Sequence, residues 1–114
     1  MKDYYERLDG SDPLSAVDLL SPSLQFAFVR PEGTLAGGRA ELERFIRERP
    51  ARSHRVLAWW REEDTEVAVG ESVDEDGTVL AAFQVVMQLD AAGVIEDYFA
   101  AVHPTLRLRI RGDT

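Results

Sequence analysis

The second half of the chain contains four segments with strand composition, and these constrain its fold more than any other feature. The segments are separated by the acidic or glycine-containing turns REED, VDEDG and DAAG, and they span residues 54–61, 65–73, 78–89 and 94–102. Branched and aromatic residues bounded by such turns are typical of strands joined by tight connections. This half therefore predicts an antiparallel meander.

In the first half the apolar residues recur mostly at helical spacing, which predicts three helices with one strand among them. Residues 1–9 place apolar side chains at helical spacing, and a second helix is expected over 13–20 after an N-cap at Ser11 or Asp12. The short apolar run at 24–29 predicts a strand, and RAELERFIRER at 39–49 predicts the third helix. Helices followed by strands predict an α+β fold with three N-terminal helices packed on a curved, antiparallel or mixed sheet.

The segment at 78–89 predicts a central strand with both faces covered. Its apolar residues occupy both odd and even positions, so they would point to both faces of the sheet. The helices would cover one face. A second copy of the chain is the economical cover for the other, because a bare apolar patch promotes association. Gln84 in this strand is expected to lie in a pocket or at an interface, and adjacent Trp59 and Trp60 must face opposite sides of their strand. We therefore expect a homodimer formed through the sheet face.

Composition excludes several kinds of site and partner. The chain has no cysteine, which excludes disulfides and Cys-ligated metals, and neither histidine has the spacing of a metal site. A net charge of −8 argues against nucleic acid or an anionic membrane as partner. The TLRLRIR run at 105–111 is expected to form a further strand or an ordered tail. Its arginines are expected to pair with acidic turns of the same or a neighbouring subunit. We expect one cytoplasmic domain over 1–114, with no cofactor and no metal.

Several sequence motifs occur in an order that resembles a known superfamily. They are YYERLDGSDPLSAVDLLSPSLQFAFVRP, then GTLAGGRAELERFI, then SHRVLAWW, EVAVGESV and GVIEDYF. This order resembles the cone-shaped domain shared by nuclear transport factor 2, ketosteroid isomerase and SnoaL-type polyketide cyclases, over about residues 3–103. The resemblance implies a curved sheet and helices that enclose a cone open at one end, where ligands enter. It leaves the activity open, because one fold can host many functions.

The chain departs from the catalytic patterns of two members of this superfamily. Ketosteroid isomerase uses a carboxylate base near the end of the first strand, where this chain has Arg30. The epoxide hydrolases of similar fold use an Arg and an Asp at the positions that Gly70 and Ser72 occupy here. Neither standard activity is therefore expected, although Arg30 could bind an anionic or carbonyl group of a ligand.

Other residues could still supply acid–base chemistry. SnoaL-like cyclases place an acid–base Asp in the pocket, and the corresponding groups here are Glu71, Glu96 and Asp97. The match at GVI implies a register in which Glu96 and Tyr98 line the pocket. The carboxylates of Glu96 and Asp97 could instead be solvated charges at the rim or on the outer face. His54 is the natural proton carrier near neutral pH, although a histidine at a strand end can also be structural.

Two functional hypotheses follow from these residues. The first is a SnoaL-like or ketosteroid-isomerase-like pocket protein that binds a small, largely apolar molecule. In this hypothesis Glu96, Tyr98 and His54 would carry cofactor-independent, isomerase-like or cyclase-like chemistry. The ligand contacts would come from Tyr5, Arg30, Trp60, Glu71 and Gln84. The second hypothesis is a non-catalytic dimeric interaction domain whose cone is filled by its own side chains.

Overall fold

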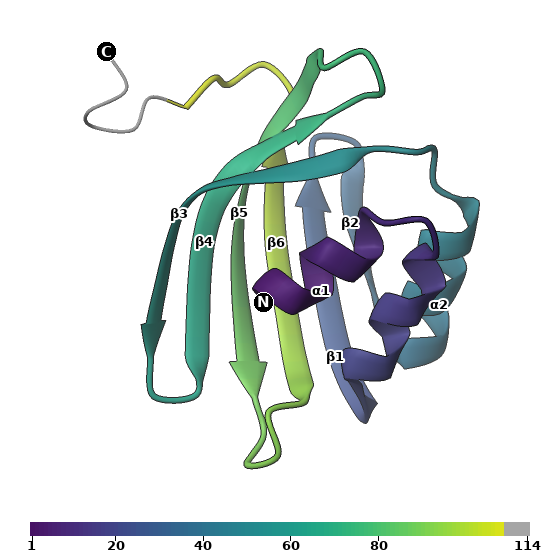
Figure 1. Cartoon of the computed structure of the whole chain (residues 1–114), viewed down its shortest axis with the longest axis vertical. Helices are drawn as coiled ribbons and strands as arrows, with labels where there is room; N and C mark the ends of the chain where they lie inside the picture. Colours follow the sequence, from purple (N-terminus) through teal and green to yellow (C-terminus); the bar gives the residue numbers. More distant parts are fainter. Residues whose placement is uncertain (109–114) are drawn as a thin grey trace.

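A computed structural model describes residues 1–108, in which a strongly curved sheet carries all its helices on one face (Figure 1). Its elements in chain order are α1 (Lys2–Leu8), the 3-10 helix η1 (Pro13–Leu19), β1 (Leu20–Arg30), β2 (Gly33–Gly37), α2 (Arg39–Glu48), β3 (Ser53–Glu62), β4 (Thr65–Val73), β5 (Val79–Leu89) and β6 (Ile95–His103). The α+β class is confirmed.

The sheet has the strand order β2-β1-β6-β5-β4-β3. The predicted meander of β3 to β6 is confirmed, with antiparallel pairing at each step. Strand β1 lies parallel to β6, so the sheet is mixed. The hairpin strand β2 was not predicted. The first glycine of GTLAG indicated a turn, and the last indicated the start of a helix. β2 lies at the edge of the sheet described for residues 1–108 and pairs with β1, where such a short strand is sufficient.

The helices differ from the prediction in two ways. The second helix is a 3-10 helix, and β1 begins directly after it at Leu20, not at residue 24. Pro22 is accommodated inside β1 because the pairing with β6 is irregular between Leu20 and Gln25. In addition, α2 follows β1 as predicted, but the unpredicted strand β2 lies between them, and three N-terminal α-helices are therefore not confirmed.

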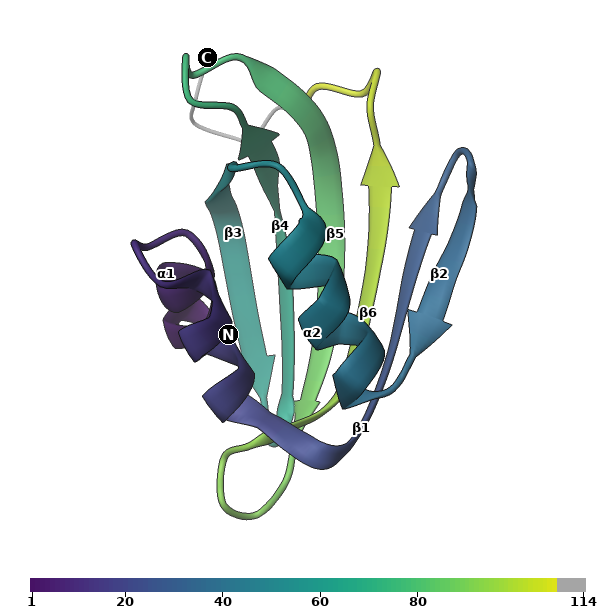
Figure 2. The same ribbon diagram turned by 90° about the vertical axis from the view of Figure 1, so that its right-hand side faces the viewer.

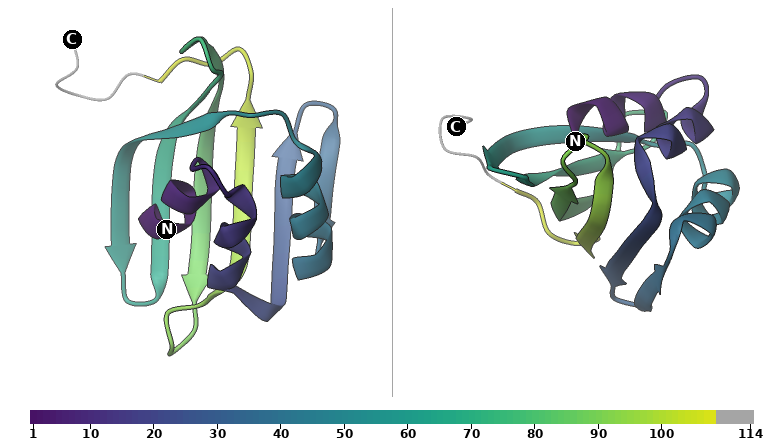
Figure 3. Two further views of the ribbon diagram at one scale, coloured as in Figure 1. Left: turned by 45° about the vertical axis from the view of Figure 1, so that its right-hand side comes forward. Right: turned by 90° about the horizontal axis from the view of Figure 1, so that it is seen from below.

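Figures 2 and 3 show the helices against the concave face of the sheet. The hydrophobic core lies between the two. Tyr4 and Leu8 of α1 and Leu42 of α2 are buried against inward-facing residues of the central strands. The main inward residues of the sheet are Phe26, Phe28, Phe83, Val85 and Met87. No helix within residues 1–108 is long and apolar enough to cross a membrane.

The outer face of the sheet is not covered by any element of residues 1–108. Along β5, Phe83, Val85 and Met87 point inward and are buried, whereas Gln84 and Val86 point outward and are exposed. Residues 1–108 therefore do not supply the predicted cover on the second face of β5.

The start of the C-terminal run forms no strand at 104–108, and residues 109–114 of the predicted strand or tail lie outside the described residues. Arg107 donates hydrogen bonds to the carbonyl oxygens of Pro104, Leu106 and Val79. Arg107 forms no ion pair with an acidic turn within residues 1–108, and pairing with a neighbouring subunit stays a prediction.

Gly70 on β4 is required by close packing beneath the core. A Cβ at this position would overlap the backbone oxygen of Arg55 and lie 2.8 Å from Cζ of Phe83. We predict that Gly70→Ala lowers the free energy of unfolding by about 1–3 kcal/mol, measured by urea denaturation, because backbone cannot move aside cheaply. Gly38→Ala is the matched control, since its nearest atom would be 3.5 Å away. Equal, small effects of both changes would contradict the packing argument.

Candidate functional site

A cavity of about 90 Å³ lies between the helices and the concave face of the sheet. Most of its wall is apolar and comes from Leu8, Phe28, Phe45, Ile46 and Phe83. An apolar cavity of roughly 150 Å³ accommodates benzene. At about 90 Å³ this cavity is smaller, so it suits a molecule with a smaller apolar body than a benzene-sized cavity would take, or one small apolar end of a larger molecule.

Two tyrosine hydroxyl groups meet at the wall of this cavity. The hydroxyl oxygens of Tyr5, from α1, and Tyr98, from β6, are 3.2 Å apart, and both residues are buried. Tyr4 packs edge-on against the Tyr98 ring at a centroid distance of 5.3 Å. Two hydroxyls joined by one hydrogen bond use only one of their two hydrogens. The second hydrogen remains available to an acceptor such as a ligand carbonyl oxygen.

Burial keeps these phenols protonated. Desolvation is the largest cause that raises the pKa of Tyr4, Tyr5 and Tyr98, and the neighbouring phenols raise it further by charge repulsion. At neutral pH the three groups are therefore neutral donors, not bases.

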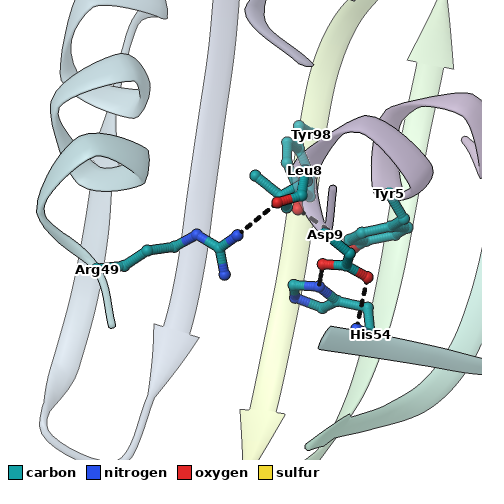
Figure 4. Close-up of polar contacts among 6 residues, drawn as sticks. All are labelled: Tyr5, Leu8, Asp9, Arg49, His54 and Tyr98. Carbon is teal, nitrogen blue, oxygen red and sulfur yellow. Dashed lines mark hydrogen bonds and ion pairs between the residues drawn. The ribbon is translucent and has the colours of Figure 1, made fainter. Parts of the chain in front are cut away.

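Asp9 and His54 form a hydrogen-bonded pair at the same cavity (Figure 4). Asp9 ends α1, and its Oδ2 accepts the backbone N–H of His54 at 2.7 Å, while its Oδ1 lies 2.8 Å from Nδ1 of the imidazole. Because a carboxylate can only accept, the proton of the neutral ring resides on Nδ1, which leaves Nε2 as a free base. The ring stacks on Tyr5 at a centroid distance of 4.6 Å, so base and phenols are neighbours.

Three of the predicted site residues line the cavity, namely Tyr5, His54 and Tyr98. Glu96 does not. Pairing between β5 and β6 shifts from Gln88↔Asp97 to Leu89↔Ile95, which makes Glu96 an extra residue in a β-bulge. Glu96 and Asp97 are consequently both exposed, and the prediction that Glu96 shares the inward face with Tyr98 is wrong.

The other four predicted ligand contacts also lie away from the cavity. Glu71 lies on the outer face of the sheet and pairs with Arg55 at 2.9 Å. Gln84 and Trp60 are exposed on that same face. Arg30, at the end of β1, interacts with Glu32 and the backbone oxygen of Gly33. None of these four residues lines the cavity.

The two adjacent tryptophans do face opposite sides, as predicted. Trp59 turns inward and its Nε1 donates to Oε2 of buried Glu66 at 2.9 Å. Trp60 turns outward and is 56% exposed. Trp60 therefore does not plug the cone.

Two arginines at the cavity were not identified from the sequence. Arg49 follows the last residue of α2, and Arg52 lies in the loop before β3. In Figure 4, Arg49 extends toward the end of α1, where its Nη2 donates to the carbonyl oxygen of Leu8 at 2.9 Å. Among residues 1–108, no group of three His, Asp or Glu side chains could hold a metal ion.

Comparison with known proteins identifies the fold. The sequence matches no family model and no curated protein. A candidate isomerase of the SnoaL-like family from Agrobacterium tumefaciens superposes with a TM-score of 0.71 at 14% identity, over 89% of this chain and 92% of that chain. A candidate ketosteroid isomerase from Kribbella flavida gives a TM-score of 0.72 at 15% identity, over 98% and 81%.

A SnoaL-like protein of unknown function from Burkholderia thailandensis gives a TM-score of 0.64 at 14% identity, over 89% of each chain. The chain therefore has the nuclear transport factor 2-like fold that SnoaL-like and ketosteroid-isomerase-like proteins share, and the resemblance seen in the sequence is confirmed at the level of the fold. Identities this low carry no information about the reaction.

The buried tyrosines, which are all three tyrosines of the chain, predict a loss of stability at alkaline pH. Their pKa values are raised in the folded state, so the unfolded chain releases these protons first, near its ordinary pKa of about 10. Their contribution to stability is therefore fully present below about pH 10 and is lost as pH rises above it. Urea denaturation followed across this range should show the decline.

Ultraviolet absorbance provides the decisive readout for these phenols. Tyrosinate absorbance should appear only together with loss of the native circular dichroism signal. Ionisation near pH 10 in a protein that keeps its native signal would contradict the burial of these groups.

Proposed function

We propose that this chain binds a small, largely apolar carbonyl compound in the cavity and transfers a proton on it without a cofactor. The observation that carries the proposal is the convergence of the Asp9–His54 pair and the Tyr5–Tyr98 hydroxyl pair on one apolar cavity. Two proteins of similar structure are described as candidate isomerases, which agrees with this class of reaction.

The chemistry follows from the protonation states of these groups. Neutral His54 would take a proton from the carbon next to the carbonyl group through Nε2, and the resulting imidazolium would be stabilised by Asp9. The enolate oxygen would receive a hydrogen bond from the tyrosine pair, whose raised pKa values keep it in the donor form. The imidazolium would then return the proton to the same or a neighbouring atom of the substrate.

The histidine would replace the carboxylate base of ketosteroid isomerase. The position of that base, at the end of the first strand, is occupied here by Arg30, which points away from the cavity lining and contacts Glu32. The proposed base instead comes from the first residues of β3, on the other side of the cavity. A related fold could thus support proton transfer from a different strand.

Proton transfer can be tested without knowing the natural substrate. Exchange of the α-protons of acetone, butanone and cyclopentanone in D₂O should be accelerated by the protein and followed by proton NMR. His54→Gln should reduce the acceleration roughly 10²–10⁴-fold, the usual contribution of a general base. His103→Gln is the matched control, because His103 is exposed at the end of β6 and does not line the cavity.

Folding of both variants is verified by thermal denaturation. If a ketone shifts the NMR signals of cavity residues but the wild type does not accelerate exchange, catalysis is excluded for that ketone class. The non-catalytic binding alternative would then account for the cavity.

We also propose that the chain forms a homodimer through the outer face of the sheet. Outward residues of five strands form an apolar row through the direct pairs Ala27↔Phe99, Phe99↔Val86, Val86↔Val67 and Val67↔Trp60. Within this row Phe99 is 43% exposed and Trp60 is 56% exposed. Exposed aromatic and aliphatic side chains in one continuous band are characteristic of an interface.

The neighbouring rows limit the extent of this band. On one side lies a second row with Val29, Ala101 and Val69, in which Gln84 is the polar member. On the other side every member is polar, in the row Gln25, Asp97, Gln88, Thr65 and Glu62. An apolar centre with a polar margin is the usual composition of such a surface.

Substitution of Phe99 tests the dimer. Phe99→Glu should convert a dimer at micromolar concentration into a monomer in gel filtration with light scattering, because it places a charge in the centre of each apolar band. Leu106→Glu is the matched control, since Leu106 is also exposed but follows the end of the sheet. A wild-type protein that is monomeric at this concentration would exclude the proposal.

A further inference from the structure

We propose that the ligand carries a carboxylate group, which Arg49 and Arg52 bind at the wall of the cavity while its apolar part enters the space beside Tyr98. This inference rests on the proposed function only in requiring that the cavity binds a small molecule. It adds one feature to that molecule, a carboxylate group beside the apolar, carbonyl-bearing part, which neither the fold nor the proton-transfer residues specify.

The first observation is that several guanidinium donors at the cavity have no partner. Nε and Nη1 of Arg49 and Nε of Arg52 are buried and make no hydrogen bond within residues 1–108. Only Nη2 of Arg49 has a protein acceptor there, the carbonyl oxygen of Leu8. Buried donors without acceptors are uncommon in folded proteins and call for an explanation. Both side chains line the cavity, so a ligand bound there could supply the acceptors.

The second observation is that two like charges are held close together, and neither forms an ion pair in the described part of the chain. Desolvation and then the charge of Arg52 lower the pKa of Arg49, which reflects their proximity. Neither arginine forms an ion pair within residues 1–108. The cavity lining contains no aspartate or glutamate, although the whole chain has a net charge of −8. The site is therefore locally cationic in an acidic protein.

The nearest carboxylate is already engaged elsewhere. Asp9 raises the pKa of Arg49 through its charge, but both of its oxygens interact with His54, at 2.7 Å and 2.8 Å. Asp9 forms no ion pair with either arginine within residues 1–108, so it does not supply the acceptors that the two guanidinium groups lack.

Geometry and size favour a carboxylate over other anions. The planar fork of a guanidinium group matches the two oxygens of a carboxylate, and two such forks can share one carboxylate. The remaining wall is mainly apolar and the cavity is only about 90 Å³, so a monoanion with a short apolar body suits it better than a strongly hydrated phosphate. The carboxylate would lie at the arginines, and the rest of the molecule would extend toward His54 and Tyr98.

The test compares acids with amides of the same shape. Isobutyrate and cyclopropanecarboxylate should bind about tenfold or more tightly than isobutyramide and cyclopropanecarboxamide, measured by NMR titration of cavity residues. Arg52→Gln should remove this preference and leave amide affinity unchanged. Arg44→Gln is the matched control, because it removes the same charge from an exposed position on α2 that does not line the cavity.

Further measurements separate loss of the site from loss of the fold. Because Arg52→Gln relieves repulsion between like charges, its melting temperature should equal or exceed that of the wild type. Arg52→Lys keeps the charge but not the fork, and should retain only part of the preference. A folded Arg52→Gln variant that loses acid and amide binding equally would overturn the inference.

The remaining outcomes are also decisive. Equal binding of acids and amides to the wild type would overturn the carboxylate inference but leave the proposed function standing. Binding of inorganic phosphate with the affinity of the acids would show an anion site without selection for an apolar body, and would overturn the inference as stated. If neither acids nor amides nor the ketones bind in the cavity, the proposed function and this inference both fail.

Discussion

The contact between Asp9 and His54 joins the two parts on which the site depends. One carboxylate accepts a backbone N–H and faces an imidazole nitrogen, and these contacts connect the end of α1 to the start of β3, 45 residues away. The same contact positions Tyr5 against the imidazole ring and determines which nitrogen of His54 carries the proton. Loss of this carboxylate would therefore change both the placement of α1 and the orientation of the His54 ring.

Local irregularities in the sheet determine which side chains reach the cavity. The extra residue in β6 places Glu96 and Asp97 in solvent, while Tyr98 and Ala100 continue inward. A second irregularity in β3, at Leu57, allows both His54 and Trp59 to face the concave side although they differ by an odd number of residues. Because a strand alternates its faces with a period of two, each added residue reverses the faces beyond it. The lining is thus selected by two bulges as much as by residue type.

The same irregularities limited which side chains of the site could be predicted from the sequence. Period and turn signals predicted α1, α2 and the meander, because those signals are local. The order of the motifs predicted the cone, and His54, Tyr5 and Tyr98 followed from residue type on inward positions. Glu96 was misplaced because a bulge has no local signal here. Asp9 and Arg49 were missed because their partners, His54 and Leu8, are distant in sequence.

The balance between stability and binding argues against a merely vestigial cavity. A cone that served only as structural core would be most stable with apolar residues, since each buried polar group without a partner costs about 1–3 kcal/mol. This chain instead holds Arg49 and Arg52 together with unpaired donors at the cavity, beside an oriented histidine and a pair of buried hydroxyls. These groups lie on α1, β3, β6 and the end of α2, so their convergence is not a property of one element. Arrangements that oppose stability in this way are typical of sites maintained for a ligand.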